Sequence, residues 1–194
     1  MALMLSLLSA LVVFSYGLGG SLGCNLTLNH DVVSNENLLL LKEMGRISPS
    51  LCLDDRKDFR FPQQAVNGRQ VQKTQAISVL YEMLGQTSRV FLREQSSAAW
   101  NTTLLEKLRH RLHRQLEDLK PCVVQEVRQA ESAAGKDPTA DVKRYFSGIR
   151  LYLKQKKYSD CAWEVVRGEI MSLFPSLTSL QEGLRQKDGD LGSP

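Results

Sequence analysis

The chain has 194 residues, of which 25 are Lys or Arg and 21 are Asp or Glu, giving a formal net charge of +4. Acids and bases are mixed along the sequence, and no aromatic residues alternate with a basic run, so we exclude nucleic acid as a partner. The length suffices for one domain with a hydrophobic core, and the sequence contains neither an internal repeat nor a second domain.

The first 23 residues form an apolar leader that contains no Asp, Glu, Lys or Arg. Its run Leu5–Phe14 is too short to span a membrane and is typical of a secretory signal. Ser21 and Gly23 are the small residues that a signal peptidase reads, so we predict cleavage before Cys24. Residues 24–194 are then one secreted domain without a segment that inserts in a membrane. A buried N-terminal helix is the alternative, although such helices carry a polar face.

All four cysteines lie in the mature part of the chain: Cys24, Cys52, Cys122 and Cys161. An even number of cysteines in an exported chain predicts two disulfides, and the count leaves three pairings open. The spacings are wide and include no Cys-x-x-Cys, which argues against a zinc site or a thioredoxin-like motif.

Two sequons mark candidate N-glycosylation sites, one at Asn25 and one at Asn101. Asn101 is the better candidate. Asn25 follows a cysteine that is expected to be bridged, and the bridge would hinder the transferase.

Apolar residues recur at helical spacing along most of the mature chain, and no strand pattern competes with them. A first helix is predicted from about Asp31 to Arg46. The connection that follows, from about Ser48 to Gln72, is rich in turn formers, and loops of this length are usually functional or pinned down. Cys52 is a candidate pin. A second helix is predicted from about Lys73 to Arg93, and Ser96–Ala99 breaks the pattern.

The third predicted helix runs from about Asn101 to Lys120. Its apolar stripe consists of Leu105, Leu108, Leu112, Leu116 and Leu119. Thr103 and Glu106 fit a capping box at its start, and Pro121 is expected to end it. The small and polar residues from Gln129 to Lys136 are typical of a loop.

Clear start signals precede the last two predicted helices. Asp137 and Pro138 form an N-cap followed by a proline at the first helical position of the fourth helix. Ser159 is the predicted cap of the fifth helix, and Pro175 should kink or end that helix. The polar tail 185–194 is expected to be disordered. Together the elements predict an all-α bundle with at least one crossover connection.

The fifth helix begins with a stretch, Cys161–Met171, that carries two neighbouring stripes. Its core stripe consists of Trp163, Val166, Ile170, Leu173 and Phe174. The adjacent face carries Glu164, Arg167, Gly168, Met171 and Pro175. Because one apolar stripe is enough to fold a helix, we interpret Arg167 and Met171 as a contact surface for another molecule. The alternatives are a solvated charge at Arg167 and a core filler at Met171.

The sequence contains no catalytic motif: it has no Gly-rich phosphate loop, no Gly-x-Ser-x-Gly and no His-Glu-x-x-His. His110 and His113 are spaced like a metal pair, but Arg109, Arg111 and Arg114 around them repel a cation, so we expect no metal site. With all cysteines paired, no thiol nucleophile remains. We therefore expect a protein that is not an enzyme, needs no cofactor and acts through its surface.

Several long motifs resemble those of the type I interferons. They are Cys52–Phe59, Tyr81–Leu84, Ser96–Trp100, Lys156–Arg167 and Glu169–Met171. The resemblance covers essentially all of the mature chain. Within the family it points to the omega, tau and alpha branches.

The resemblance implies a five-helix cytokine bundle with an up-up-down-down course and a long crossover connection. It also implies one of the three disulfide pairings, Cys24 with Cys122 and Cys52 with Cys161. Each bridge would close a loop of roughly a hundred residues and, in the chain-entropy model, would contribute about 4 to 5 kcal/mol to stability.

The family likeness further implies a secreted monomer that bridges the two chains of the type I interferon receptor and activates Janus kinase and STAT signalling, with an antiviral and antiproliferative response. The positions that match contacts of the high-affinity receptor chain are Leu53, Arg56, Arg167, Gly168 and Met171. Those that match contacts of the low-affinity chain are Tyr81, Glu82, Leu104, Arg109, His113 and Lys143. The Cys52–Cys161 bridge would bring Arg56 near Arg167. Alternatively, Arg56 pairs internally with a nearby Asp.

A different class of function is also compatible with a secreted helical bundle. Such a protein could be a carrier or a membrane-active host-defence protein. This alternative requires an interior cavity or an exposed apolar face.

Overall fold

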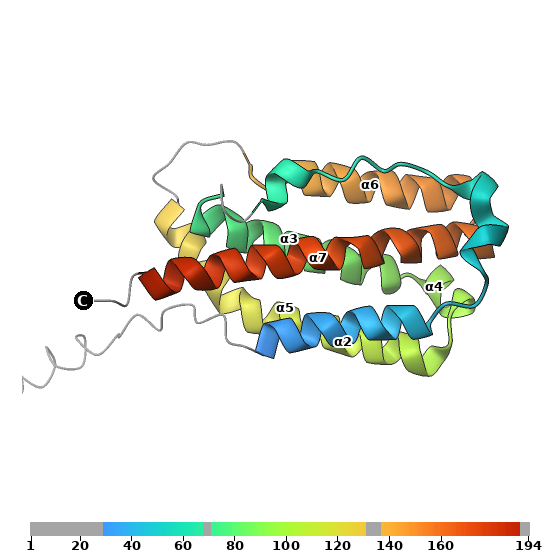
Figure 1. Cartoon of the computed structure of the whole chain (residues 1–194), viewed down its shortest axis with the longest axis horizontal. Coiled ribbons are helices and arrows are strands. Elements are labelled where there is room, and N and C mark those ends of the chain that lie inside the picture. Colours follow the sequence, from blue (N-terminus) through green and yellow to red (C-terminus); the bar gives the residue numbers. More distant parts are fainter. Residues whose placement is uncertain (1–28, 68–70, 131–136, 191–194) are drawn as a thin grey trace, which may run out of the picture.

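The computed structural model describes residues 29–67, 71–130 and 137–190, and every regular element in these ranges is helical (Figure 1). The elements are α2 (Asn29–Glu43), η1 (Pro49–Asp55), η2 (Gln63–Val66), α3 (Lys73–Phe91), α4 (Glu94–Ala99), α5 (Thr102–Ala130), α6 (Ala140–Gln155) and α7 (Asp160–Asp190). The predicted all-α fold is confirmed.

Four long helices form the bundle, and α6 packs beside it. α2 packs against α5 and α7, while α3 packs against α5, α6 and α7. Figure 1 shows that α2 and α3 run in one direction and that α5 and α7 run in the other, which is the expected up-up-down-down course. The connection between α2 and α3 crosses the end of the bundle and then follows α6.

The apolar stripes predicted from the sequence form the core. Every member of the α7 stripe is at most 3% exposed: Trp163, Val166, Ile170, Leu173 and Phe174. The α5 stripe differs from the prediction at one turn, because Gln115 is 1% exposed and Leu116 is only half-buried. Asn37 Nδ2 on α2 donates to Gln115 Oε1 at 3.2 Å, which gives this buried amide a partner.

The prediction that Pro121 ends the third helix is wrong, since α5 continues through it to Ala130. Leu119 and Cys122 on either side are 0% and 6% exposed, whereas Pro121 itself is exposed. The proline removes one backbone hydrogen bond, but the buried residues around it keep the helix packed against the bundle. Residues 129 and 130, expected in a loop, are therefore helical, and residues 131–136 lie outside the described part.

The start of α5 also differs from the prediction. Asn101 Oδ1 accepts a hydrogen bond from the backbone N–H of Leu104 at 3.2 Å, so Asn101 is the cap rather than Thr103. Glu106 pairs with Arg109 instead of closing a capping box. The residues expected to break the helical pattern belong to the short helix α4.

The fourth helix begins at Ala140, later than the predicted start at Pro138. Asp137 Oδ1 accepts hydrogen bonds from the backbone N and the Oγ1 of Thr139 at 2.9 and 2.7 Å, which closes a turn before the helix. These bonds and a third from Lys143 lower the pKa of Asp137 to about 2.

The predicted cap of the fifth helix is confirmed, because Ser159 Oγ accepts from the backbone N–H of Ala162 at 3.3 Å. Pro175 does not end α7, which continues to Asp190. Residues 185–190 are thus helical, contrary to the expected disorder, and residues 191–194 lie outside the described part. Leu180 and Leu184 are fully buried and hold this last portion of α7 against the bundle.

The long connection is pinned to the bundle at several points. The predicted Cys52–Cys161 disulfide is present and brings the two Cα atoms to 5.2 Å, joining η1 to the start of α7. Phe59 packs edge-on against Tyr152 of α6 with ring centroids 5.2 Å apart, and the Tyr152 hydroxyl donates to Asp55 O at 2.6 Å. Burial and, to a lesser degree, Asp55 raise the pKa of Tyr152 to about 12.

Residues 1–28 lie outside the described part of the chain. The secretory leader, the Cys24–Cys122 bridge and the sequon at Asn25 therefore stay predictions. Within the described residues, no helix is both long and apolar enough to cross a membrane.

The continuous path of α5 predicts the effect of Pro121→Ala. The substitution restores a backbone N–H within the helix and should raise the free energy of unfolding by about 1 to 3 kcal/mol. Urea unfolding followed by circular dichroism measures this change. Lys120→Ala, at the exposed neighbouring position, should change stability by less than about 0.5 kcal/mol. A Pro121→Ala variant that is no more stable than the parent would contradict a helix running through this position.

Candidate functional site

The connection and α7 enclose an open hollow of about 620 Å³, which we name the η1–α7 hollow. It is lined by Pro49, Cys52, Arg56, Lys57, Asp58, Glu164, Val165, Arg167, Gly168, Glu169 and Met171. Four of the five residues predicted to contact the high-affinity chain therefore lie together, although they come from segments far apart in sequence. The fifth, Leu53, lies on η1 outside the lining, and its side chain is 52% exposed.

Arg167 supports the hollow from inside the protein. It is only 8% exposed, and its Nε donates to Glu164 Oε2 at 2.8 Å while Nη2 donates to Glu164 Oε1. Its Nη1 donates to Leu41 O on α2 at 2.8 Å and to Met171 Sδ at 2.9 Å. The alternative of a solvated charge is wrong, and the prediction that a partner touches this guanidinium directly conflicts with its burial.

Gly45 leaves the space that the guanidinium occupies. A Cβ placed on Gly45 would lie 3.2 Å from Arg167 Nη2, 3.3 Å from Arg167 Cζ and 3.3 Å from Lys42 O. These distances are shorter than ordinary van der Waals contact. A side chain at this position would therefore push the guanidinium by a few tenths of an ångström from its place beside Leu41.

Arg56 is, with the neighbouring Lys57, an exposed cation that lines the hollow. Among the described residues its side chain makes no hydrogen bond or ion pair, and only its backbone N–H is engaged, with Leu53 O at 3.3 Å. The neighbouring Asp55 pairs with Lys156 at 2.8 Å, so Asp55 is not the internal partner that the alternative interpretation of Arg56 requires. Asp58 Oδ1 instead accepts from the backbone N–H of Arg60 at 2.8 Å.

Two further features define the surface around Arg56. Gly168 is exposed, and a Cβ added there would meet nothing within 4 Å, so a partner can approach the α7 backbone closely. Leu51 is 75% exposed on η1, beside Leu53. Sequence reasoning missed Leu51, although two leucines on either side of a bridged cysteine in the long connection were a signal for exposed apolar side chains.

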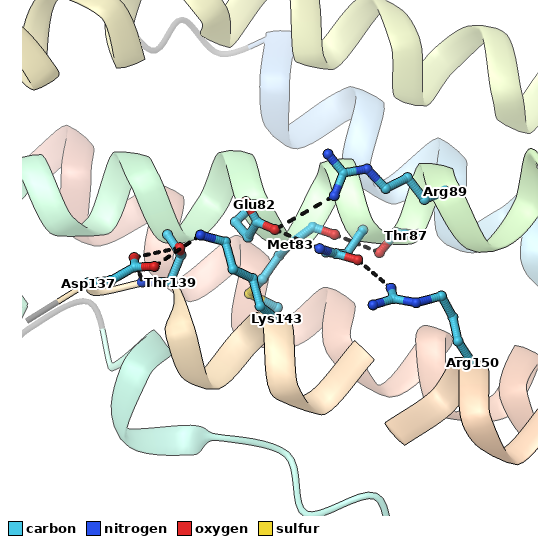
Figure 2. Close-up of polar contacts among 9 residues, drawn as sticks. Glu82, Met83, Thr87, Arg89, Asp137, Thr139, Lys143 and Arg150 are labelled. Atoms are coloured by element: carbon cyan, nitrogen blue, oxygen red, sulfur yellow. Dashed lines mark hydrogen bonds and ion pairs between the residues drawn. The ribbon is translucent and has the colours of Figure 1, made fainter. Parts of the chain in front are cut away.

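The residues predicted for the low-affinity chain come from α3, α5 and α6, and α3 packs against both other helices. Tyr81 and Leu104 are half-buried and pack against the core, while His113 and Lys143 are exposed. Lys143 Nζ lies 3.0 Å from Asp137 Oδ2 at the start of α6 (Figure 2).

Arg109 differs from the other predicted contacts because it holds elements of the bundle together. Its Nε donates to Phe91 O at the end of α3 at 2.9 Å, and Nη2 donates to Ser96 Oγ and Ser97 Oγ on α4 at 3.2 and 3.1 Å. Its side chain is 17% exposed and also pairs with Glu106. These bonds tie α5 to α3 and α4, and its predicted role as a receptor contact stays a prediction.

A group of arginines on the α3–α6 face was missed by sequence reasoning. Figure 2 shows Glu82 and Arg89 on α3 and Arg150 reaching toward them from α6, where its Nη1 donates to Gln86 Oε1. Burial lowers the pKa of Arg150, and the neighbouring Arg89 and Arg93 lower it further. Arg89 is 66% exposed and only 4.0 Å from Glu82, which also accepts from Gln86. This face therefore attracts an acidic partner.

A family model described as the interferon alpha/beta domain matches residues 26–184. The chain belongs to the interferon alpha/beta family. Interferon omega-2 from Equus caballus is 60% identical, interferon omega-1 from Homo sapiens 58% and interferon tau from Cervus elaphus 54%, each over 195 aligned positions that cover 100% of both chains. The resemblance to type I interferons, including the omega and tau branches, is confirmed, and the match is not to an enzyme family.

Two solved structures share the fold. Zebrafish interferon 1 is 26% identical, with a TM-score of 0.65, and the match covers 79% of this chain and 94% of that one. Zebrafish interferon 2 is 24% identical, with a TM-score of 0.64, covering 76% and 96%. These matches support the bundle architecture.

The buried contacts of Arg167 predict that Arg167→Ala lowers the stability of the whole protein. It leaves Glu164, which is 4% exposed, as a buried charge without its partner, and such losses cost about 3 to 5 kcal/mol. Urea unfolding measures the loss. The double variant E164L/R167M, which removes both charges, should recover most of it. A single variant as stable as the parent would be evidence against the buried pair.

Proposed function

We propose that this protein is a secreted type I interferon that bridges the two chains of the type I interferon receptor. The bridge brings together the Janus kinases attached to the receptor chains, which activates STAT signalling and an antiviral and antiproliferative response. The observation that carries the proposal is the match to the interferon alpha/beta family over residues 26–184. The chain functions as a monomeric ligand, without a cofactor.

The high-affinity chain binds at the η1–α7 hollow in this proposal. Arg56 supplies an exposed charge without an internal partner, and Leu51 and Leu53 supply exposed apolar area beside it. Arginine is one of the residues in which binding hot spots are enriched. Gly168 and Met171 provide the α7 wall, and Arg167 positions Met171 rather than touching the receptor.

The low-affinity chain binds the surface formed by α3, α5 and α6. Tyr81, Leu104 and His113 contribute partly apolar area, and Lys143 joins Arg89 in a basic field. The two proposed surfaces use different elements, so both receptor chains can bind at the same time. Neither surface alone brings two kinases together.

Secretion and glycosylation belong to the same proposal. The apolar leader directs export, and Asn101 is exposed at the start of α5. Its Oδ1 caps the helix, so a glycan on Nδ2 leaves the cap in place.

No specific observation favours the carrier or membrane-active alternative. Among the side chains that the structure describes, the large apolar ones that are exposed are distributed over several elements: Leu39, Leu51, Leu53, Leu92, Val124 and Leu151. Side chains scattered in this way do not form the continuous apolar face that insertion in a bilayer requires. Dye leakage from anionic vesicles tests the alternative, and strong leakage at low protein concentration would support it.

An interferon-response reporter in matched cells tests the proposed function. We expect a response to the purified protein and its loss when a blocking antibody occupies the receptor. A response that survives the antibody, or no response to the folded protein, would reject receptor bridging.

Arg56→Ala should weaken binding to the isolated high-affinity chain by about 2 kcal/mol or more, because it removes an exposed charge at the centre of the proposed contact. Its free energy of unfolding should stay within about 0.5 kcal/mol of the parent, since Arg56 has no internal partner. Surface plasmon resonance and urea unfolding measure the two quantities. Lys120→Ala, an exposed charge on α5, serves as the control. Unchanged binding by Arg56→Ala would remove Arg56 from the proposed contact.

The double variant R89E/K143E tests the second surface. Reversing both charges should lower the association rate with the low-affinity chain by at least about tenfold at low salt and reduce the reporter response. Binding to the high-affinity chain should not change, which separates this variant from Arg56→Ala. An unaltered association rate would show that the basic field does not guide the receptor.

A further inference from the structure

Basic residues are concentrated on one segment of α5 to a degree that the proposed receptor contacts do not explain. Six of the eight residues from 107 to 114 are basic: Lys107, Arg109, His110, Arg111, His113 and Arg114. Arg109 is bonded within the bundle, and His113 belongs to the proposed low-affinity surface. The other four have no role in the function proposed above.

These four residues lie together in space. They line an open hollow of about 630 Å³ between α2 and α5, the α2–α5 groove, with Glu36, Leu39, Leu40 and Glu43 on the α2 side. Positions 107, 110, 111 and 114 follow successive turns of one helix face and span about 10 Å. Figure 1 shows α2 and α5 side by side along the edge of the bundle away from α6.

The charges in the groove are not balanced. Arg111 pairs with Glu36 across it. Lys107, His110 and Arg114 are exposed and, among the described residues, make no hydrogen bond or ion pair. Glu43 is the remaining acid on the α2 wall. Lys107 and Arg114 are cations without partners, and Glu43 offsets only one of their two charges, so this groove keeps an excess of positive charge that favours an anionic ligand.

Other types of ligand fit the groove poorly. In the described residues, no three His, Cys, Asp or Glu side chains gather where they could hold a metal ion. No aromatic side chain lines the groove, so it lacks the stacking platform of a single-strand nucleic-acid site. Leu39 is the one apolar lining side chain that is exposed, at 55%, which is too little apolar area to anchor in a bilayer.

We propose that the α2–α5 groove binds a sulfated polysaccharide, with Lys107, His110 and Arg114 contacting sulfate groups along the chain. Guanidinium and ammonium groups bind such oxyanions through charge-assisted hydrogen bonds. An extracellular partner follows from secretion, and the inference rests on that part of the proposed function but not on receptor bridging. The ligand would hold the protein near cell surfaces while both receptor surfaces stay free.

Binding to immobilised heparin, measured as a function of salt, tests this proposal. The variant K107Q/H110Q/R114Q should bind at least about tenfold more weakly at physiological salt, and the slope of log affinity against log salt should fall by about two. Arg111 is retained because it pairs with Glu36. The control K120Q/K157Q also removes two permanent positive charges, but outside the groove. Its slope of log affinity against log salt should differ from the parent's slope by less than about one. Equal losses in both variants would mean that only total charge matters and would overturn the site.

A second variant tests the site by a gain of binding. Glu43→Gln removes the remaining acid from the groove wall and should strengthen heparin binding about two- to threefold, a result that misfolding does not produce. Heparin stripped of its sulfates should not bind. Equal or tighter binding to single-stranded DNA or to phosphatidylserine vesicles, lost in the same triple variant, would assign the groove to another class of partner.

Receptor bridging and polysaccharide binding in the groove can each be rejected by experiment without rejecting the other. The triple variant should keep the parent's affinity for both isolated receptor chains, because its three positions lie outside both proposed receptor surfaces. A protein that binds heparin through the groove but gives no reporter response would reject only receptor bridging. A protein that signals but binds heparin no better than the triple variant would reject only the groove.

Discussion

The buried ion pair between Arg167 and Glu164 is the constraint on which the candidate binding surface depends. Both side chains are almost inaccessible to water, so each charge is tolerable only because the other is present. The guanidinium also reaches Leu41 O on α2 and Met171 on the next turn of α7. One side chain therefore fixes the distance between two helices and the position of a residue in the hollow. The disulfide at Cys52 then holds the connection against the same helix.

Local patterns in the sequence were sufficient to predict the helical bundle, but they did not predict the hydrogen bonds and ion pairs between its elements. The helical stripes of α5 and α7 repeat every three or four residues, so their burial followed from the period of the chain. The continuation through Pro121 depended on packing against other helices, which no local signal contains. Likewise, Arg167 looked like a surface charge because its partner Leu41 lies on a different helix, and the bonds of Arg109 were not predicted because its acceptor Phe91 O is on α3. The family resemblance supplied the Cys52–Cys161 pairing, which spacing alone left open.

The three surfaces described above differ in physical character. The η1–α7 hollow is lined by the exposed cations Arg56 and Lys57, and the exposed leucines of η1, Leu51 and Leu53, lie outside its lining. The α3–α6 face carries the exposed Arg89 and the partly buried Arg150, and the α2–α5 groove carries exposed cations on one helix. Salt should therefore weaken binding at all three surfaces, because each carries exposed charges and screening acts mainly on such charges.

The η1–α7 hollow is assembled from two segments that are distant in the chain, so it cannot form until both segments have been synthesised. Cys52 and Cys161 are separated by 109 residues, and the helix that forms the other wall follows Cys161. During synthesis the connection leaves the ribosome long before its counterpart exists, so it can make none of its native long-range contacts at that stage. The proposed recognition surface is therefore complete only after nearly the whole chain has been made and the Cys52–Cys161 bridge has formed, and truncated or reduced products would lack it.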